Sequence, residues 1–239
     1  MKSYLISAIV AIIIVTIGVS KSNAWMVDCN DGTFTSNTGE SATNSFYASI
    51  SDNGYSGKCA NLTLNGARLT YANSFNGNDI ISLDKGTIEL NFKPTVTSNS
   101  FPRLFDTTNE NIAIYTAGAA SPHAVTIKMK QSNGTSISFS STTKLVNDTW
   151  YDIKLDYDLS LASNNVKLYI NGIEDGHGTV TTATLAGTGT SFFWGIMAYG
   201  GQSWNGYYDN LQINQVIPEP ATLGLLAMGA LGALLRRKR

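Results

Sequence analysis

The sequence has few charged residues, only two cysteines and two histidines, and no long helical pattern. Lysine, arginine, aspartate and glutamate together make up 14% of its 239 residues. Between Trp25 and Gln215 no segment keeps a 3.6-residue apolar period, and Asn, Ser, Thr and Gly dominate instead. This combination is typical of an exported all-β protein rather than a helical one.

Basic residues are especially scarce in the central part of the chain. Residues 25–220 contain ten Lys and Arg against 17 Asp and Glu, which gives a net charge of −7 with no basic patch or stripe. The charge argues against a nucleic-acid partner. About 195 residues is the usual size of one domain with one core.

The residue patterns of common catalytic sites are also missing. Glycan hydrolases need clustered carboxylates, because one acts as an acid while another acts as a base or nucleophile. No Glu-x-Asp-x-Glu strand occurs, and the five glutamates are scattered at Glu40, Glu89, Glu110, Glu174 and Glu219. His123 follows Ser-Pro in a predicted loop, His177 lies within an Asp-Gly-His-Gly segment, and there is no Gly-x-Ser-x-Gly elbow or phosphate-binding loop. We therefore predict that the protein is not an enzyme.

The first 24 residues have the pattern of a signal peptide. Met1 and Lys2 give a short positive start, and residues 5–19 are almost wholly apolar but shorter than a membrane span. Ser22 and Ala24 place small residues where signal peptidase reads the chain. We expect an N-terminal signal helix, cleaved after Ala24; the alternative is an uncleaved anchor.

The C-terminus combines a proline motif, an apolar run and a basic end. The triplet Pro218, Glu219, Pro220 prevents a helix from running back into the domain. Residues 221–235 are apolar and cover about 22 Å as a helix at about 1.5 Å per residue, less than the roughly 30 Å hydrocarbon core. The chain stops on the basic residues Arg236, Arg237, Lys238 and Arg239. These cations stay in the cytoplasm, so we expect a short transmembrane helix with the domain outside.

These three parts, in this order and beside a signal peptide, resemble the PEP-CTERM sorting signal of Gram-negative bacteria. The resemblance implies that a membrane-embedded exosortase cuts near residues 218–220 and that the protein accompanies exopolysaccharide production. An ordinary tail anchor would explain the apolar run and the charges but not the motif. The expected location is transiently the inner membrane, then the cell surface or extracellular matrix.

Alternating segments predict short antiparallel strands. Ile88, Leu90 and Phe92 face one way in residues 86–92, and residues 125–130 and 137–139 form a predicted hairpin around a Ser-Asn-Gly turn. Residues 151–158 and 166–170 repeat the alternation before an Asn-Gly turn. Strands at roughly ten-residue spacing without intervening helices predict a two-sheet sandwich or jelly roll.

Five sequence segments, taken together and in order, resemble the laminin-G-like, concanavalin-A-like jelly roll. They are residues 57–64, 86–94, 149–155, 168–172 and 207–213. The resemblance predicts an all-β fold of two antiparallel sheets over residues 25–217. The expected organisation is a signal peptide at 1–24, this domain at 25–217 and a sorting signal at 218–239.

The two cysteines are expected to form a disulfide. Cys29 and Cys59 would pair in an oxidising periplasm, and the alternative is two buried thiols. Two cysteines are too few for a zinc site.

Asp209 is a carboxylate expected to face the core. It shares the strand phase of Tyr207 and Leu211, so it is expected to accept backbone N–H bonds. The alternative is a Ca²⁺ site like that of many relatives of this fold, and no other cofactor is expected.

Aromatic residues are densest near the end of the domain. Phe192, Trp194 and Tyr207 are expected in the core. Flat rings beside glycines and amides suit the apolar C–H faces and hydroxyls of sugars, so the predicted ligand-binding residues are Tyr199, Trp204 and Tyr208.

The sequence thus favours a non-catalytic surface or matrix protein that binds a carbohydrate, the cell's own exopolysaccharide, after processing by signal peptidase and exosortase. The second hypothesis is a structural or adhesive module that binds a surface protein. The third is a degenerate glycan hydrolase or lyase.

Overall fold

The computed structural model describes residues 24–64, 66–75, 77–96, 103–117, 123–195 and 205–215. All of them belong to one unit, Ala24–Val216. The expected signal helix and transmembrane helix lie outside the described residues. Within the described ranges, no helix is both long and apolar enough to cross a membrane.

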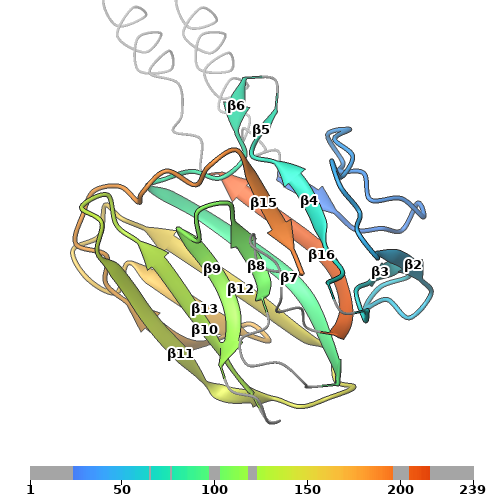
Figure 1. Ribbon diagram of the computed structural model, residues 1–239. Coiled ribbons are helices and arrows are strands. Elements are labelled where there is room, and N and C mark those ends of the chain that lie inside the picture. Colours follow the sequence, from blue (N-terminus) through green and yellow to red (C-terminus); the bar gives the residue numbers. More distant parts are fainter. Residues whose placement is uncertain are drawn as a thin grey trace, which may run out of the picture. The chain divides into compact units, whose positions relative to one another are not determined.

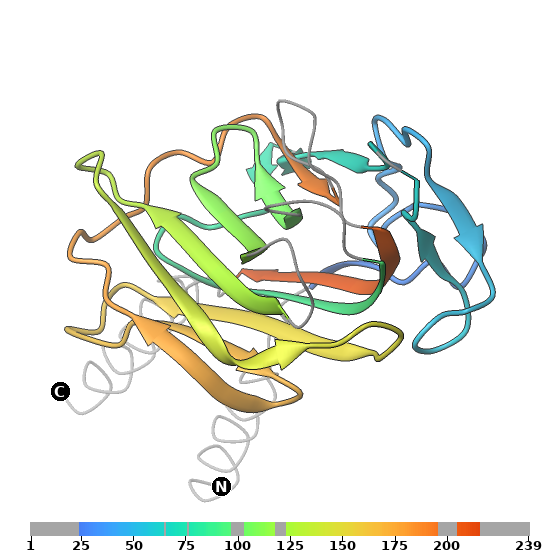
Figure 2. The same ribbon diagram turned by 60° about the horizontal axis from the view of Figure 1, so that its bottom comes forward.

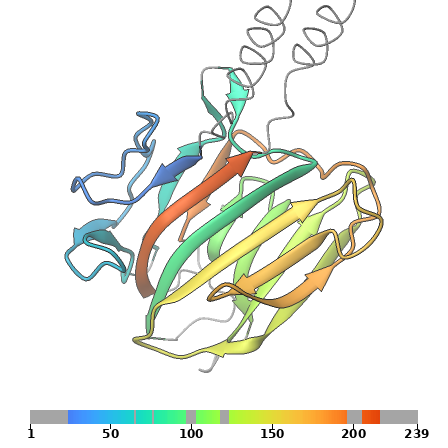
Figure 3. The same ribbon diagram turned by 180° about the vertical axis from the view of Figure 1, so that it is seen from behind.

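Two antiparallel sheets form the layers of a sandwich (Figures 1 and 2). The larger sheet has the order β14-β13-β12-β7-β16-β3-β2, and β1 also pairs with β16. Its strands are β1 (Trp25–Val27), β2 (Ser49–Ser51), β3 (Cys59–Asn61), β7 (Lys85–Val96), β12 (Tyr151–Asp158), β13 (Val166–Ile170), β14 (Ile173–Gly178) and β16 (Asn205–Gln215). Figure 3 looks onto this sheet from behind.

The smaller sheet has the order β11-β10-β9-β8-β15-β4 and faces the viewer in Figure 1. Its strands are β4 (Leu69–Ala72), β8 (Arg103–Thr107), β9 (Ile112–Ala117), β10 (His123–Lys130), β11 (Ser136–Leu145) and β15 (Ser191–Trp194). A separate two-stranded ribbon joins β5 (Ser74–Phe75) to β6 (Asn78–Asp79). The predicted all-β, two-sheet antiparallel sandwich is confirmed.

Alternation explains why the strands pack as they do. In β12 every second residue is buried, and the same holds for β13. Residues that alternate between an apolar and a polar face bury one face of each sheet, and the two inner faces make the core. The Asn171-Gly172 turn between β13 and β14 has positive φ at both positions, 53° and 78°, as a tight hairpin of this sequence requires. Phe192 and Trp194 are fully buried, as expected.

The last strand departs from simple alternation. Tyr208, Leu211 and Ile213 face the core, whereas Tyr207 is only partly buried. The pairing of β16 with β7 shifts register between Asp209 and Gln212, and Asn210 lies in the left-handed region with φ 48°. A bulge inserts one residue and reverses the phase of the side chains beyond it. The expectation that Tyr207 belongs to the core is therefore wrong, and Tyr208 takes that place.

Candidate functional site

One row of side chains crosses the outer face of the six-stranded sheet. Phe193 pairs with Asp106, Asp106 with Ala113, and Ala113 with Lys128, each on the neighbouring strand. Residues directly opposite in antiparallel strands point to the same face. Phe192 and Trp194 on β15 are buried in the core, so Phe193 and its row face outward.

A second row lies beside the first. Arg103 on β8 pairs with Tyr115 on β9, which pairs with Thr126 on β10. The Arg103 guanidinium lies over the Tyr115 ring, 4.6 Å from its centroid. The pairing of β8 with β9 shifts register between Arg103 and Phe105, so a bulge keeps both Arg103 and Asp106 on the outer face.

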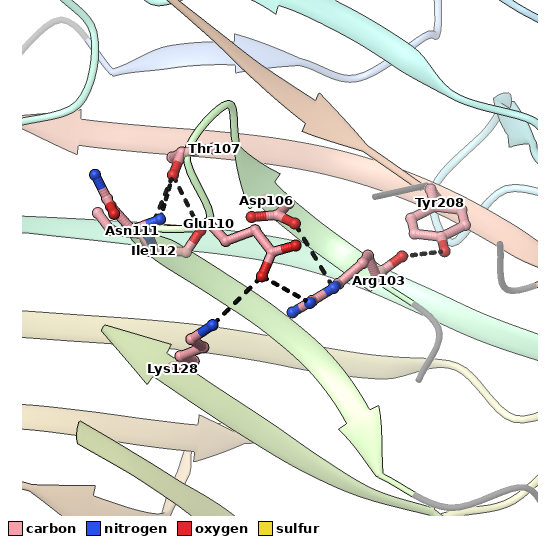
Figure 4. Close-up of polar contacts among 8 residues, drawn as sticks. All are labelled: Arg103, Asp106, Thr107, Glu110, Asn111, Ile112, Lys128 and Tyr208. Atoms are coloured by element: carbon pink, nitrogen blue, oxygen red, sulfur yellow. Dashed lines mark hydrogen bonds and ion pairs between the residues drawn. The ribbon is translucent and has the colours of Figure 1, made fainter. Parts of the chain in front are cut away.

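Glu110 joins the two rows from the turn between β8 and β9 (Figure 4). Its Oε2 lies 3.4 Å from Nη2 of Arg103 and 3.3 Å from Nζ of Lys128. Nε of Arg103 also lies 3.6 Å from Oδ2 of Asp106. Two carboxylates and two cations thus form one connected cluster, in which the side chains of Arg103 and Asp106 are 8% and 0% exposed.

The turn that carries Glu110 is fixed by hydrogen bonds. The Thr107 hydroxyl accepts the N–H groups of Asn111 and Ile112, each at 3.1 Å, and the Glu110 N–H donates to the Thr107 carbonyl at 2.8 Å. Glu110 itself has a φ of 52°. Non-glycine residues adopt this conformation rarely, and surrounding structure must hold them there. The turn therefore directs the Glu110 carboxylate back over the sheet.

Several buried polar atoms of the cluster make no hydrogen bond within the described residues. Neither oxygen of Asp106 nor Nε and Nη1 of Arg103 does so, although Nε and Oδ2 form the longer ion pair given above. Each buried group without a hydrogen bond costs about 1–3 kcal/mol. The cluster therefore holds two acceptors and two donors at an energetic cost.

Burial also perturbs the acid strength of Asp106. It raises the pKa of this carboxyl from the ordinary 3.8 to about 7; Arg103 opposes the rise and Glu110 adds to it. Perturbed titratable groups of this kind concentrate at functional sites. With Phe193 and Tyr115 on the same face, the cluster combines ring faces with hydrogen-bonding groups.

The sequence did not point to this cluster. Glu110 was noted only as one of five scattered glutamates, and Arg103, Asp106 and Phe193 were not singled out. A usable signal was present, because the charged residues Arg103 and Asp106 flank the apolar pair 104–105 and all four are buried in β8. The pairing of Asp106 with a ring 87 positions later is visible only in the sheet register.

The structure places the predicted ligand residues differently. Tyr199 and Trp204 lie outside the described residues. Tyr208 is fully buried, and its hydroxyl donates to the Arg103 carbonyl at 3.3 Å, across the sandwich and beneath the cluster. It presents no ring face to a ligand, so the expectation that Tyr208 contacts a sugar is corrected.

Asp209 makes the backbone contacts expected of it. Its Oδ2 accepts the Ser56 N–H at 3.1 Å, and Oδ1 accepts the Asn210 N–H at 2.8 Å. Burial raises the pKa of Asp209, and these two bonds oppose the rise. In the described part of the chain, no group of three or more His, Cys, Asp or Glu residues is placed to hold a metal ion.

The two cysteines are buried free thiols in this structure, so the expected disulfide is not formed. Cys59 begins β3, and Cys29 follows β1; both strands pair along the same edge of β16. Burial raises the pKa of Cys59 to about 11, and Asp209 adds to the rise. The pKa of Cys29 is raised further by burial, and Asp209 and Cys59 contribute to it.

The two antiparallel sheets place the domain in the class of jelly-roll β-sandwiches. Residues 65–221 match the laminin G family described as the concanavalin A-like lectin/glucanases superfamily, and the chain belongs to it. Residues 216–239 match the PEP-CTERM protein-sorting motif. Both resemblances drawn from the sequence are confirmed, and the motif implies export and membrane-associated processing.

Solved structures share the fold at low sequence identity. Domain 4 of AbnA, a GH43 extracellular arabinanase from Geobacillus stearothermophilus in complex with arabinotriose, is 20% identical with a TM-score of 0.59, covering 83% of this chain and 95% of that one. The binding domain of Paraclostridial Mosquitocidal Protein 1 is 12% identical (TM-score 0.63; 84% and 51% covered). The botulinum neurotoxin serotype D ligand-binding domain, in complex with N-acetylneuraminic acid, is 10% identical (TM-score 0.61; 86% and 50% covered).

This chain spans about half the length of the two toxin domains. At these identities the similarity shows the fold alone. No curated protein matches the chain in sequence.

Proposed function

We propose that this protein is an exported, non-catalytic carbohydrate-binding protein whose ligand lies on the outer face of the six-stranded sheet. The observation that carries the proposal is the connected cluster of charged side chains around Arg103 and Asp106, which lies on the same face as the rings of Phe193 and Tyr115. We propose further that an exosortase acts at residues 218–220, after which the protein resides at the cell surface or in the extracellular matrix. Tyr199 and Trp204 stay predicted ligand contacts.

Sugar hydroxyls suit the cluster because each both donates and accepts a hydrogen bond. One hydroxyl donates to Asp106 while accepting from Arg103, which satisfies groups that otherwise pay a desolvation penalty. Charge-assisted hydrogen bonds of this kind are about twice as strong as neutral ones. The C–H faces of the sugar pack on the exposed part of Phe193.

The same cluster argues against hydrolysis. A retaining or inverting glycosidase needs a second carboxyl group that is free to act as a base or nucleophile. Here the Glu110 carboxylate is bound by both Arg103 and Lys128 through one oxygen. Because these two ion pairs engage the Glu110 carboxylate, Asp106 has no free second carboxyl group beside it.

The test is retention of the purified, exported protein on the host's exopolysaccharide and on a panel of neutral glycans. We expect Phe193→Ala to lose at least tenfold in affinity, whereas Ile173→Ala, an exposed apolar residue on the edge strand of the other sheet, retains it. Circular dichroism and thermal melting establish that both variants fold. No retention of any glycan by the folded wild type refutes carbohydrate binding and favours a structural or protein-binding module.

Further measurements test the remaining hypotheses on ligand contact, metal requirement and hydrolysis. Trp204→Ala tests the predicted contact outside the described residues. Loss of retention in chelator would assign a metal requirement, and release of reducing sugar from any polysaccharide would restore the hydrolase hypothesis.

A further inference from the structure

The outer face of the eight-stranded sheet carries a second aromatic cluster. Lys93 on β7 pairs directly with Tyr207 on β16, and the flanking pair of Phe92 and Tyr208 is buried in the core. Lys93 and Tyr207 therefore face outward. The Lys93 ammonium lies 4.7 Å from the Tyr207 ring centroid and 5.3 Å from that of Trp150.

A third ring, that of Tyr55, joins the cluster from a loop. Tyr55 lies between β2 and β3, and its ring meets Trp150 edge to face, with centroids 5.9 Å apart and planes at 72°. Tyr55 is 55% exposed, while Trp150 and Tyr207 are partly buried. Two rings thus contact one cation, and a third ring from another part of the chain packs on one of them.

The loop that carries Tyr55 is tied to the sheet. The N–H of Ser56 donates to Asp209, two residues from Tyr207 on the same strand. The N–H of Lys58 donates to the Asn30 side chain at 3.1 Å, and the N–H of Gly54 donates to the Gly57 carbonyl at 3.0 Å. A ring held in place before binding loses less conformational freedom when a ligand stacks on it.

The charge of Lys93 forms no ion pair with an acidic side chain in the described part of the chain. The ion pairs there involve Lys85, Arg103, Lys128, Lys167 and His177. The Lys93 ammonium lies over two rings, in a domain with an excess of acidic residues. Such a cation is free to pair with an anion that arrives from solution.

We propose that Tyr55, Trp150, Tyr207 and Lys93 form a second carbohydrate-binding site, and that its ligand is an acidic sugar, a uronate. The pyranose C–H face packs on the rings. The carboxylate of the same sugar pairs with the Lys93 ammonium in a charge-assisted contact. This site lies on the opposite sheet from the Arg103 and Asp106 cluster, so it neither includes nor requires those residues.

The experiment measures affinity of the purified, exported protein for uronate oligomers and for neutral glucose oligomers of equal length. Lys93→Gln is expected to weaken uronate binding at least tenfold and to leave neutral binding unchanged. The matched control is Lys154→Gln, because Lys154 also lies over a ring, that of Tyr169 at 5.5 Å, but over that one ring alone. Binding of uronate to the wild type should also weaken as salt is raised.

Tyr55→Ala provides an independent arm, since an exposed ring is removed without disturbing the core. It should reduce affinity for the uronate oligomer. Equal losses in Lys93→Gln and Lys154→Gln would show non-specific charge attraction and overturn the site. Unchanged uronate affinity in both Lys93→Gln and Tyr55→Ala would overturn it as well.

Failure of this site and failure of the proposed function are distinguishable. Phe193→Ala should impair neutral binding and spare uronate binding, the reverse of Lys93→Gln. Uronate binding without neutral binding would retain this site and refute the other.

Discussion

Asp106→Asn should stabilise the folded protein at pH 8 and weaken glycan binding. The folded-state pKa of Asp106, raised by burial to about 7, lies above the ordinary 3.8 of the unfolded chain. Between these values the folded state holds a proton that the unfolded state releases. The free energy of unfolding therefore falls as pH rises through this window, and the loss is complete above pH 7.

The size of the effect follows from the two pKa values. A difference of about 3 in pKa corresponds to about 4 kcal/mol at about 1.36 kcal/mol per pKa unit. The asparagine variant avoids this cost but leaves Arg103 with Glu110 as its remaining ionic partner, at 3.4 Å. We expect a net gain of about 2 kcal/mol at pH 8, which for a domain of this size raises Tm by about 4–8 °C.

Thermal melts of wild type and variant at pH 4, 6 and 8 test this reasoning. At pH 4 the wild-type carboxyl is protonated and nearly isosteric with the amide, so the two melting temperatures should converge. Asp52→Asn, the same substitution at an exposed loop position, is the control. An asparagine variant that is less stable than wild type at pH 8, or whose advantage is the same at every pH, would refute the assignment. A binding residue is often destabilising, so Asp106→Asn should be more stable than wild type and should retain less glycan.

Three further outcomes are expected. Because Cys29 and Cys59 are buried free thiols, a thiol reagent should label both only after the protein is unfolded, and reductant should leave Tm unchanged; a Tm lowered by reductant would contradict this. Because Asn210 holds φ 48°, Asn210→Ala should melt below Asn210→Gly, the strain costing about 1 kcal/mol; equal melting temperatures would exclude that cost. Glu219→Gln should leave the C-terminal tail attached, detected by mass spectrometry of the membrane fraction, whereas a tail lost as in wild type would contradict recognition of the Pro-Glu-Pro motif.

Patterns within one strand were predictable from the sequence. The hairpin of β10 and β11 was expected from alternation, and the pairing of Met129 with Ile137 confirms its register. The sorting motif was also predictable from the sequence, because it consists of neighbouring residues in a fixed order. In both cases the information lies within a few tens of consecutive positions.

Bulges and pairings between distant strands were not predictable in the same way. Simple alternation placed Tyr207 in the core and left Tyr208 outside, because nothing in the residues themselves marked Asn210 as an inserted position. Likewise, Asp106 and Phe193 meet only because β15 lies beside β8. Strand order is a property of the whole fold, so a single sequence without its register cannot supply it.

The back-to-back arrangement of the two sheets has a mechanical consequence. Stacked sheets lie about 10 Å apart, so their outer faces point in opposite directions and are too far apart for one short sugar unit to reach both. If both proposed sites bind polysaccharide, a single molecule would join two separate chains. Such a molecule would act as a cross-link, and the stiffness of the surrounding gel would rise with the number of protein molecules it contains.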